Sequence, residues 1–122
     1  MLTVDPASPI ALGEQVQRGI RRAIAEGELS VGDPLPPVRQ LAADVGVNLN
    51  TIARAYRELE REGLLRTARG RGTLVAADRS AIRVPKPELR ERLRDLLADA
   101  RLAGMGEREV RRLLLDELER RM

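Results

Sequence analysis

The sequence predicts a mainly α-helical fold that contains one small β-hairpin and ends in a two-helix hairpin. In residues 36–56, two apolar patterns with helical spacing are separated by a break at Gly46, which predicts two helices joined by a tight turn. Two short extended runs on either side of a glycine-rich turn predict the β-hairpin. Two leucine-rich patterns between residues 88 and 120 predict the final pair of helices.

The composition argues against an enzyme. The 122 residues include no Cys, Trp, Phe or His, and Tyr56 is the only aromatic residue. The chain therefore lacks thiolate metal ligands and the commonest general base, and we expect no metal site, no cofactor and no catalysis. No run approaches the roughly 18 apolar residues of a membrane span, and the N-terminus lacks a signal-peptide pattern, so we expect a cytoplasmic protein.

The first helix is expected from Pro9 to Glu26, with Ser8 as its N-cap. Apolar residues keep helical spacing up to Gly27, a residue type that suits the left-handed conformation after a helix. Residues 27–37 contain two glycines and three prolines, which predicts a rigid connector whose two leucines pack onto the core.

The next two helices are expected at Val38–Val45 and from the N-cap Asn48 to about Glu62. The second has one apolar face, and its opposite face carries Asn50, Arg54, Arg57 and Arg61. A helix that enters a DNA major groove needs this division, because one side packs on a scaffold while the other offers amide and guanidinium groups to bases. The alternative is an arginine-rich face that only contacts water.

Residues 64–68 and 72–76 predict a β-hairpin whose tip contains Arg69, Gly70 and Arg71. A hairpin directly after a groove helix is a wing, in which glycine lets the backbone approach phosphate and arginine suits a narrow minor groove. The alternative is an ordinary surface turn. The net charge is only +3, yet residues 54–71 hold six arginines against three glutamates, which supports contact with DNA.

Many residues at fixed spacings now form one series: Gly27-Glu28-Leu29, Gly32, Leu35-Pro36, Arg39, Leu41-Ala42, Gly46-Val47, Ala55-Tyr56, Leu59, Glu62-Gly63-Leu64 and Gly70-Arg71-Gly72-Thr73. This series resembles the DNA-binding domain of GntR-family bacterial transcriptional regulators over about residues 9–76. The resemblance implies a winged helix-turn-helix. It also implies a base contact for Arg39, groove contacts for Asn48, Asn50 and Thr51, and wing-tip contacts for Arg69 and Gly70.

Three positions depart from the family pattern. Pro37 stands where many members carry an N-capping serine, a loss that costs about 1 kcal/mol. Leu49 and Ala53 occupy positions that are often arginine in the larger relatives, so two familiar base contacts are absent here. Arg54 lies beside Asn50 on an ideal helix, and we expect it to replace one of those contacts.

The chain is expected to divide into a DNA-binding domain at 1–76, a linker at 77–87 and a helical dimerisation segment at 88–122. The last segment holds two helices, from about Pro87 to Leu102 and from Glu107 to Arg120, with leucine stripes that two short helices cannot bury alone. The expected dimerisation residues are Leu89, Leu93, Leu96, Leu97, Val110, Leu113, Leu114 and Leu118. The alternative is that this segment folds back on its own DNA-binding domain.

The C-terminal segment resembles that of the YtrA-type branch, whose members replace the large effector domain with a brief helical dimerisation segment. The overall prediction is a sequence-specific transcriptional regulator, a homodimeric repressor that binds a pseudo-palindromic operator in double-stranded DNA. The alternative is an adaptor whose winged helix binds another protein. No effector cavity is expected in so short a C-terminal segment, and the effector, operator sequence and regulated genes are not specified by these residues.

Overall fold

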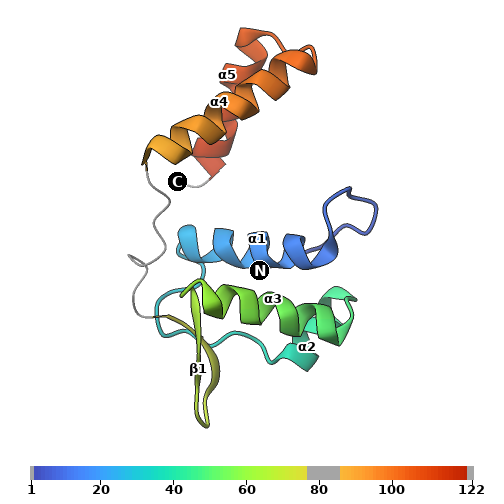
Figure 1. Cartoon of the computed structure of the whole chain (residues 1–122), viewed down its shortest axis with the longest axis vertical. Helices are drawn as coiled ribbons and strands as arrows, with labels where there is room; N and C mark the ends of the chain where they lie inside the picture. The colour runs from blue at the N-terminus through green and yellow to red at the C-terminus, as the bar shows by residue number, and fades with distance from the viewer. Residues whose placement is uncertain (1, 77–85, 121–122) are drawn as a thin grey trace. The chain divides into compact units, whose positions relative to one another are not determined.

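The computed structural model describes residues 2–76 and 86–120, which fall into two compact units. We call residues 2–76 the winged unit and residues 86–120 the tail. The elements are α1 (Leu12–Ala25), α2 (Val38–Val45), α3 (Leu49–Arg61), β1 (Leu65–Ala68), β2 (Gly72–Val75), α4 (Lys86–Leu102) and α5 (Glu107–Arg120), shown in Figure 1. The mainly helical fold with one small hairpin is confirmed.

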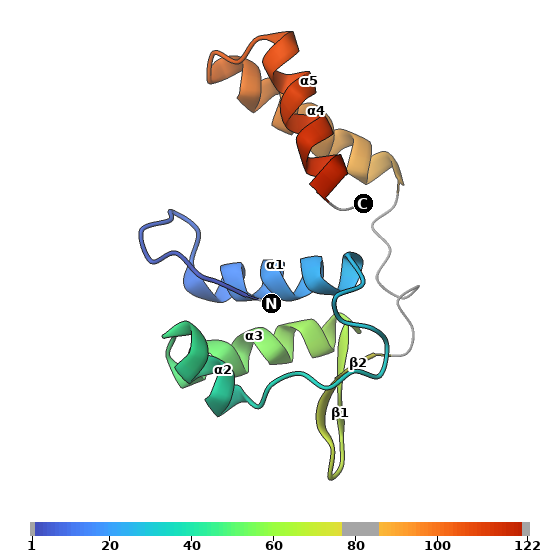
Figure 2. The same ribbon diagram turned by 180° about the vertical axis from the view of Figure 1, so that it is seen from behind.

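The core of the winged unit lies between its three helices and the base of the hairpin. Helices α1 and α3 lie side by side in both views, with α2 against α3 (Figures 1 and 2). Four residues of α3 recur at intervals of three or four positions, and this spacing places them together on the buried face: Ile52, Ala55, Tyr56 and Leu59. Within the described residues no polar or charged residue is buried, so the hydrophobic effect dominates this core.

Helix α1 begins at Leu12, so the predicted start at Pro9 with a Ser8 N-cap is wrong. The side chain of Gln15 accounts for the difference. Its Oε1 accepts a hydrogen bond from the N–H of Asp5 at 2.8 Å, and its Nε2 donates to the carbonyl of the same residue at 3.0 Å. These bonds hold the preceding segment over the first turn of α1 in a non-helical conformation. A local capping rule does not anticipate a bond that spans ten residues.

Strands β1 and β2 form an antiparallel hairpin, with Thr67 opposite Thr73. The connector before α2 extends this small sheet, because the N–H of Leu35 donates to the carbonyl of Thr73 at 2.8 Å. The N–H of Val75 donates in turn to the carbonyl of Asp33 at 2.9 Å. The connector is therefore bonded to the wing, which the glycine and proline pattern of its sequence did not indicate.

The tail consists of α4 and α5, joined by the turn at 103–106. Helix α4 already includes Lys86 and Pro87, the last two residues of the expected linker, and the other linker residues (77–85) lie outside the described residues. Neither helix has a buried residue. Eight of the nine leucines in α4 and α5 are between 38% and 88% exposed, and the ninth, Leu97, is half-buried. None of the helices in the described ranges is long and apolar enough to cross a membrane.

Candidate nucleic-acid interface

Helices α2 and α3 are joined by the tight turn that the sequence predicts. Gly46 ends α2 with a φ of 70°, in the left-handed region that favours glycine. The next residue, Val47, is buried and its N–H donates to the carbonyl of Ala42 at 3.1 Å. Asn48 then caps α3, because its Oδ1 accepts from the N–H of Asn50 at 2.8 Å. This geometry places the first turn of α3 at the surface.

The exposed face of α3 carries the predicted amide and arginines. Asn50, Arg54 and Arg57 are exposed and lie opposite the buried face. Arg61 belongs to the same stripe, but its guanidinium pairs with the carboxylate of Glu58 at 2.7 Å. Arg54 and Arg57 have no carboxylate partner within the described residues, so their charges are available to another molecule.

Helix α2 is held in place by a bond from the core. The ring of Tyr56 is buried, and its hydroxyl donates at 2.7 Å to the carbonyl of Pro36, two residues before the start of α2. Burial raises the pKa of Tyr56 to about 12 because the apolar surroundings disfavour the phenolate. Pro37 is the N-cap of α2 and supplies no side-chain bond, as expected from its chemistry. Arg39 follows in the first turn and is exposed.

Two of the predicted groove residues have internal roles. Thr51 is half-buried and its methyl faces α1, since a Cβ added to Gly13 would lie 3.3 Å from Thr51 Cγ2. Asn48 uses one lone pair of its side-chain oxygen for the cap of α3, which leaves its NH₂ group and the second lone pair for an outside partner. The side chain of Thr51 therefore lies away from the exposed face of α3 that carries Asn50 and Arg54.

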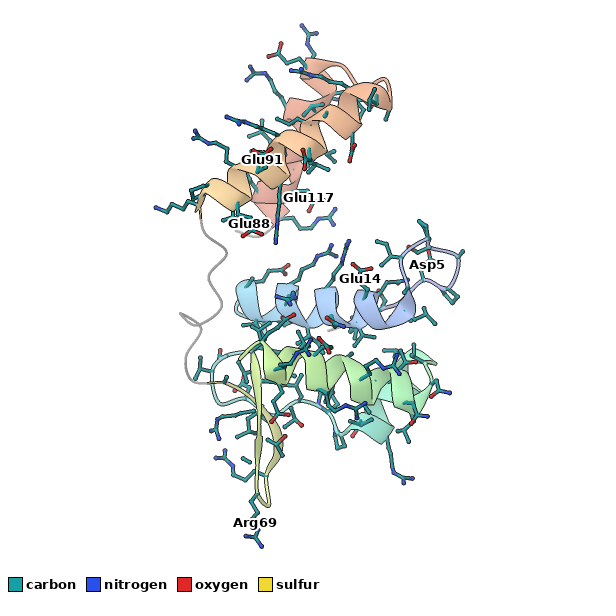
Figure 3. All side chains as sticks on the ribbon, viewed as in Figure 1. Asp5, Glu14, Arg69, Glu88, Glu91 and Glu117 are labelled. Atoms are coloured by element: carbon teal, nitrogen blue, oxygen red, sulfur yellow. The ribbon has the colours of Figure 1, made fainter. Side chains whose placement is uncertain are left out.

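The tip of the wing is a turn closed by a hydrogen bond from the N–H of Arg71 to the carbonyl of Ala68 at 2.9 Å. Gly70 adopts a φ of 78°, so the turn needs glycine at this position. Both flanking arginines are exposed, and Arg69 points away from the wing at its far end (Figure 3). The three predicted tip residues therefore lie together at the surface.

The wing is tied to α3 through Glu60, whose carboxylate accepts from the hydroxyl of Thr67 at 3.1 Å. Arg66, the neighbour of Thr67 on β1, is exposed, whereas Leu65 is buried. Arg66 was not among the predicted contact residues. The alternation of inward and outward side chains along a strand was the signal that could have identified it.

Six exposed arginines on α2, α3 and the wing have no ion-pair partner among the residues that the structure describes; we call them the unpaired arginines: Arg39, Arg54, Arg57, Arg66, Arg69 and Arg71. Two arginines of α1, in contrast, have ion-pair partners. Arg18 pairs with Glu14 at 3.0 Å, and Arg21 pairs with Glu62 at the end of α3. Phosphate and base edges are suitable partners for the unpaired guanidinium groups.

Comparison with known proteins gives consistent results. Residues 12–75, more than half of the chain, match the bacterial regulatory proteins of the gntR family. The transcriptional repressor YtrA of Bacillus subtilis is 37% identical over 107 residues, which cover 86% of this chain and 82% of that protein. A crystal structure of a transcriptional antiterminator from Listeria monocytogenes EGD-e has a TM-score of 0.80 at 31% identity, covering 98% of this chain and 90% of that one.

The DNA-binding domain of AraR, solved in complex with operator ORX1, has a TM-score of 0.56 at 29% identity and covers 62% of this chain and 95% of that one. Together, the likenesses favour DNA binding over the adaptor alternative. The chain is a DNA-binding transcriptional regulator and not an enzyme. Its fold is a winged helix-turn-helix followed by a helical segment. It belongs to the GntR family of bacterial regulatory proteins.

Proposed function

We propose that this regulator is a homodimeric repressor that binds a pseudo-palindromic DNA operator. The unpaired arginines are the observation that carries the DNA side of the proposal. In this assignment Arg39 and Asn50 contact base edges in the major groove, where arginine pairs well with guanine and asparagine with adenine. Arg69 and Arg71 contact phosphates or the minor groove, while Gly70 lets the backbone approach closely.

Arg54 and Arg57 extend the contact surface along α3. Their exposure and their lack of carboxylate partners in the described residues support this role. Thr51 and Asn48 contribute less, because the methyl of one faces α1 and the oxygen of the other caps α3. Residues 1–76 form the DNA-binding part in this proposal, 88–122 the dimerisation part and 77–87 the linker.

The exposed leucines of the tail support dimerisation. A second copy of the tail would form a four-helix cluster and cover the apolar stripes that one copy leaves in water. The proposed interface residues are Leu89, Leu93, Leu96, Leu97, Val110, Leu113, Leu114 and Leu118, of which Leu96 is 58% exposed. These leucines are already about half covered, so burying the rest of each one stabilises the assembly by roughly 1 kcal/mol before the entropy cost of association.

A hollow of about 490 Å³ lies between α4 and α5, although no cavity was expected in so short a segment. Its apolar lining includes Leu97, Val110 and Leu114, which all belong to the proposed interface. We therefore assign the hollow to side chains of the partner tail. The name of the similar YtrA protein supports repression as the outcome. Since the proposed partner is chromosomal DNA, the protein would act in the cytoplasm.

The proposal is tested by selecting binding sites from a random DNA duplex library with the full-length chain. A two-fold dimer should select an inverted repeat, with half-site centres about 34–36 Å apart if the two groove helices lie one helical turn apart. Footprinting then uses duplexes in which one half-site is deleted or moved by five base pairs. Unchanged affinity would contradict the symmetric dimer, and a selection without any consensus would contradict sequence-specific binding.

A further inference from the structure

Leu49 is an exposed leucine at the edge of the polar contact surface of α3. It is the first residue of α3 and is 40% exposed. In the described residues of the winged unit, the only other exposed large hydrophobic residue is Val31, in the connector. Leu49 does not belong to the core or to the partly buried residues packed against it. The packing of the winged unit therefore does not account for Leu49.

The position of Leu49 relates it to the DNA contacts proposed above. Its neighbours Asn48 and Asn50 are exposed, and Ala53 follows one helical turn later. At about 100° per residue, Leu49 and Ala53 lie along one edge of the face that carries Asn50 and Arg57. An apolar edge therefore borders a face of amide and guanidinium groups.

An apolar side chain can distinguish one base pair in the major groove. The 5-methyl group of thymine is the apolar feature of a base edge, whereas the other groups there are hydrogen-bond donors and acceptors. The N-terminal residues of a recognition helix are those that contact base edges. An arginine at position 49 would favour guanine, while leucine gains only from contact with a methyl group.

We propose that Leu49 is a specificity-determining residue that reads the 5-methyl group of a thymine in each half-site, with the methyl of Ala53 beside it. This inference rests on the proposed function. It assigns an A·T pair to the position that faces the start of α3, next to the base pair contacted by Asn50. In this assignment the side chain at position 49 still contacts a base. It does so through an apolar contact and not through the hydrogen bonds of an arginine.

The experiment uses the full-length chain and the consensus operator obtained by selection. Each thymine of one half-site is replaced in turn by deoxyuridine, which removes the methyl group and keeps the Watson–Crick pairing. For the wild-type protein, one replacement should weaken binding about three- to fivefold, the ratio expected for burial of one methyl group. In Leu49→Ala, thymine and deoxyuridine at that position should bind almost equally well, because only the methyl of Ala53 remains beside the base.

Two control variants make the result specific. Val31→Ala removes the other exposed hydrophobic side chain of the winged unit and should keep the full response to deoxyuridine. Leu49→Met keeps an apolar side chain of similar length and should retain most of the response. Thermal unfolding is measured for each variant, and Leu49→Ala should be nearly as stable as the wild type because residue 49 is outside the core.

The inference is overturned if no thymine of a clear consensus responds to deoxyuridine, or if Leu49→Ala responds as strongly as the wild type. Failure of the proposed function has a different result, because then selection yields no consensus. A response that disappears in Leu49→Ala and persists in Val31→Ala supports the assignment.

Discussion

The winged unit and the tail use the same aliphatic residues in opposite ways. In the winged unit, Ile20, Ile52 and Leu59 are fully buried, and Val31 and Leu49 are the only exposed large hydrophobic residues described. In the tail, no residue of α4 or α5 is buried and Leu102 is 88% exposed. The first unit has a core of its own, whereas the second exposes apolar surface, which in our proposal a second copy of the tail covers. In that proposal, amphipathic helices specify a fold in one part and an assembly in another.

Removing the tail is the strongest test of this difference. A chain that ends after residue 84 should remain folded, sediment as a monomer and bind the operator 10²–10⁴-fold more weakly. The loss has this size because the second half-site is no longer bound within one linked assembly. DNA titrations and sedimentation at tens of micromolar measure both effects. A truncated chain that remains dimeric would place the interface in the winged unit.

A matched pair of point variants gives the same test in the full-length chain. Leu93→Asp places a charge on the leucine stripe and should dissociate the dimer. Leu102→Asp is the control, because Leu102 lies off the stripe and is more exposed, at 88% against 44% for Leu93. Equal sedimentation of the two variants would count against the proposed interface.

Truncation of a buried residue should affect stability rather than association. Ile52→Ala leaves a cavity in the winged core and should lower the free energy of unfolding by about 2–5 kcal/mol. Leu96→Ala should instead weaken the dimer and leave the unfolding of the winged unit nearly unchanged. Denaturation at several protein concentrations separates these effects, since only loss of association depends on concentration. If the unfolding of both variants depended on protein concentration in the same way, the proposed difference between the winged unit and the tail would be wrong.

The contacts within the winged unit should divide into base readout and backbone attraction. Arg39→Ala should weaken operator binding by about 1–3 kcal/mol and relax specificity at one position. Arg69→Ala should weaken operator and random DNA similarly and reduce the salt slope by about one unit. Arg61→Ala is the control, since Arg61 is paired with Glu58. A loss on random DNA as large as that on the operator for Arg39→Ala would exclude direct readout.

The smallest expected effect concerns Tyr56. Tyr56→Phe removes the bond to Pro36 and should lower the free energy of unfolding by about 1 kcal/mol near neutral pH. Burial raises the pKa of Tyr56 to about 12, from 10.0, so the folded state favours the neutral phenol. This stabilisation is complete below pH 10.0 and is lost as the pH rises toward about 12. Unfolding measured from pH 8 to 11.5 should show the difference between the two proteins shrinking above pH 10; a constant difference would exclude this linkage.

Local patterns predicted much of the fold. Apolar spacing and the Gly46 turn predicted α2 at its observed bounds, and the alternation of strand and turn residues predicted the wing. The predicted start of α1 was wrong because two hydrogen bonds between the side chain of Gln15 and the backbone of Asp5 override the local capping preference. The pairing of the connector with β2 was also missed, since hydrogen bonds between distant segments leave no periodic signal in the sequence.

Helical periodicity predicted which residues of the candidate site are exposed, but it did not predict how tertiary packing positions their side chains. Asn50, Arg54 and Arg57 lie on the exposed face because helical spacing alone places them there. Thr51 was assigned to the groove by resemblance, but its methyl faces α1 at Gly13. The arrangement of two tails in a dimer depends on contacts between chains, which the pattern of one chain does not specify.

The connector has a further consequence for how DNA is chosen. It is bonded to β2 through Leu35 and to the core through Pro36 and Tyr56, so the wing and the start of α2 are held at a fixed separation. If the wing and α3 contact two adjacent grooves as proposed, this fixed separation means that the DNA has to adapt to the protein. The cost of that deformation depends on the stiffness of base steps that no side chain touches. Operators with the same contacted bases but different intervening steps should therefore be ranked by their flexibility.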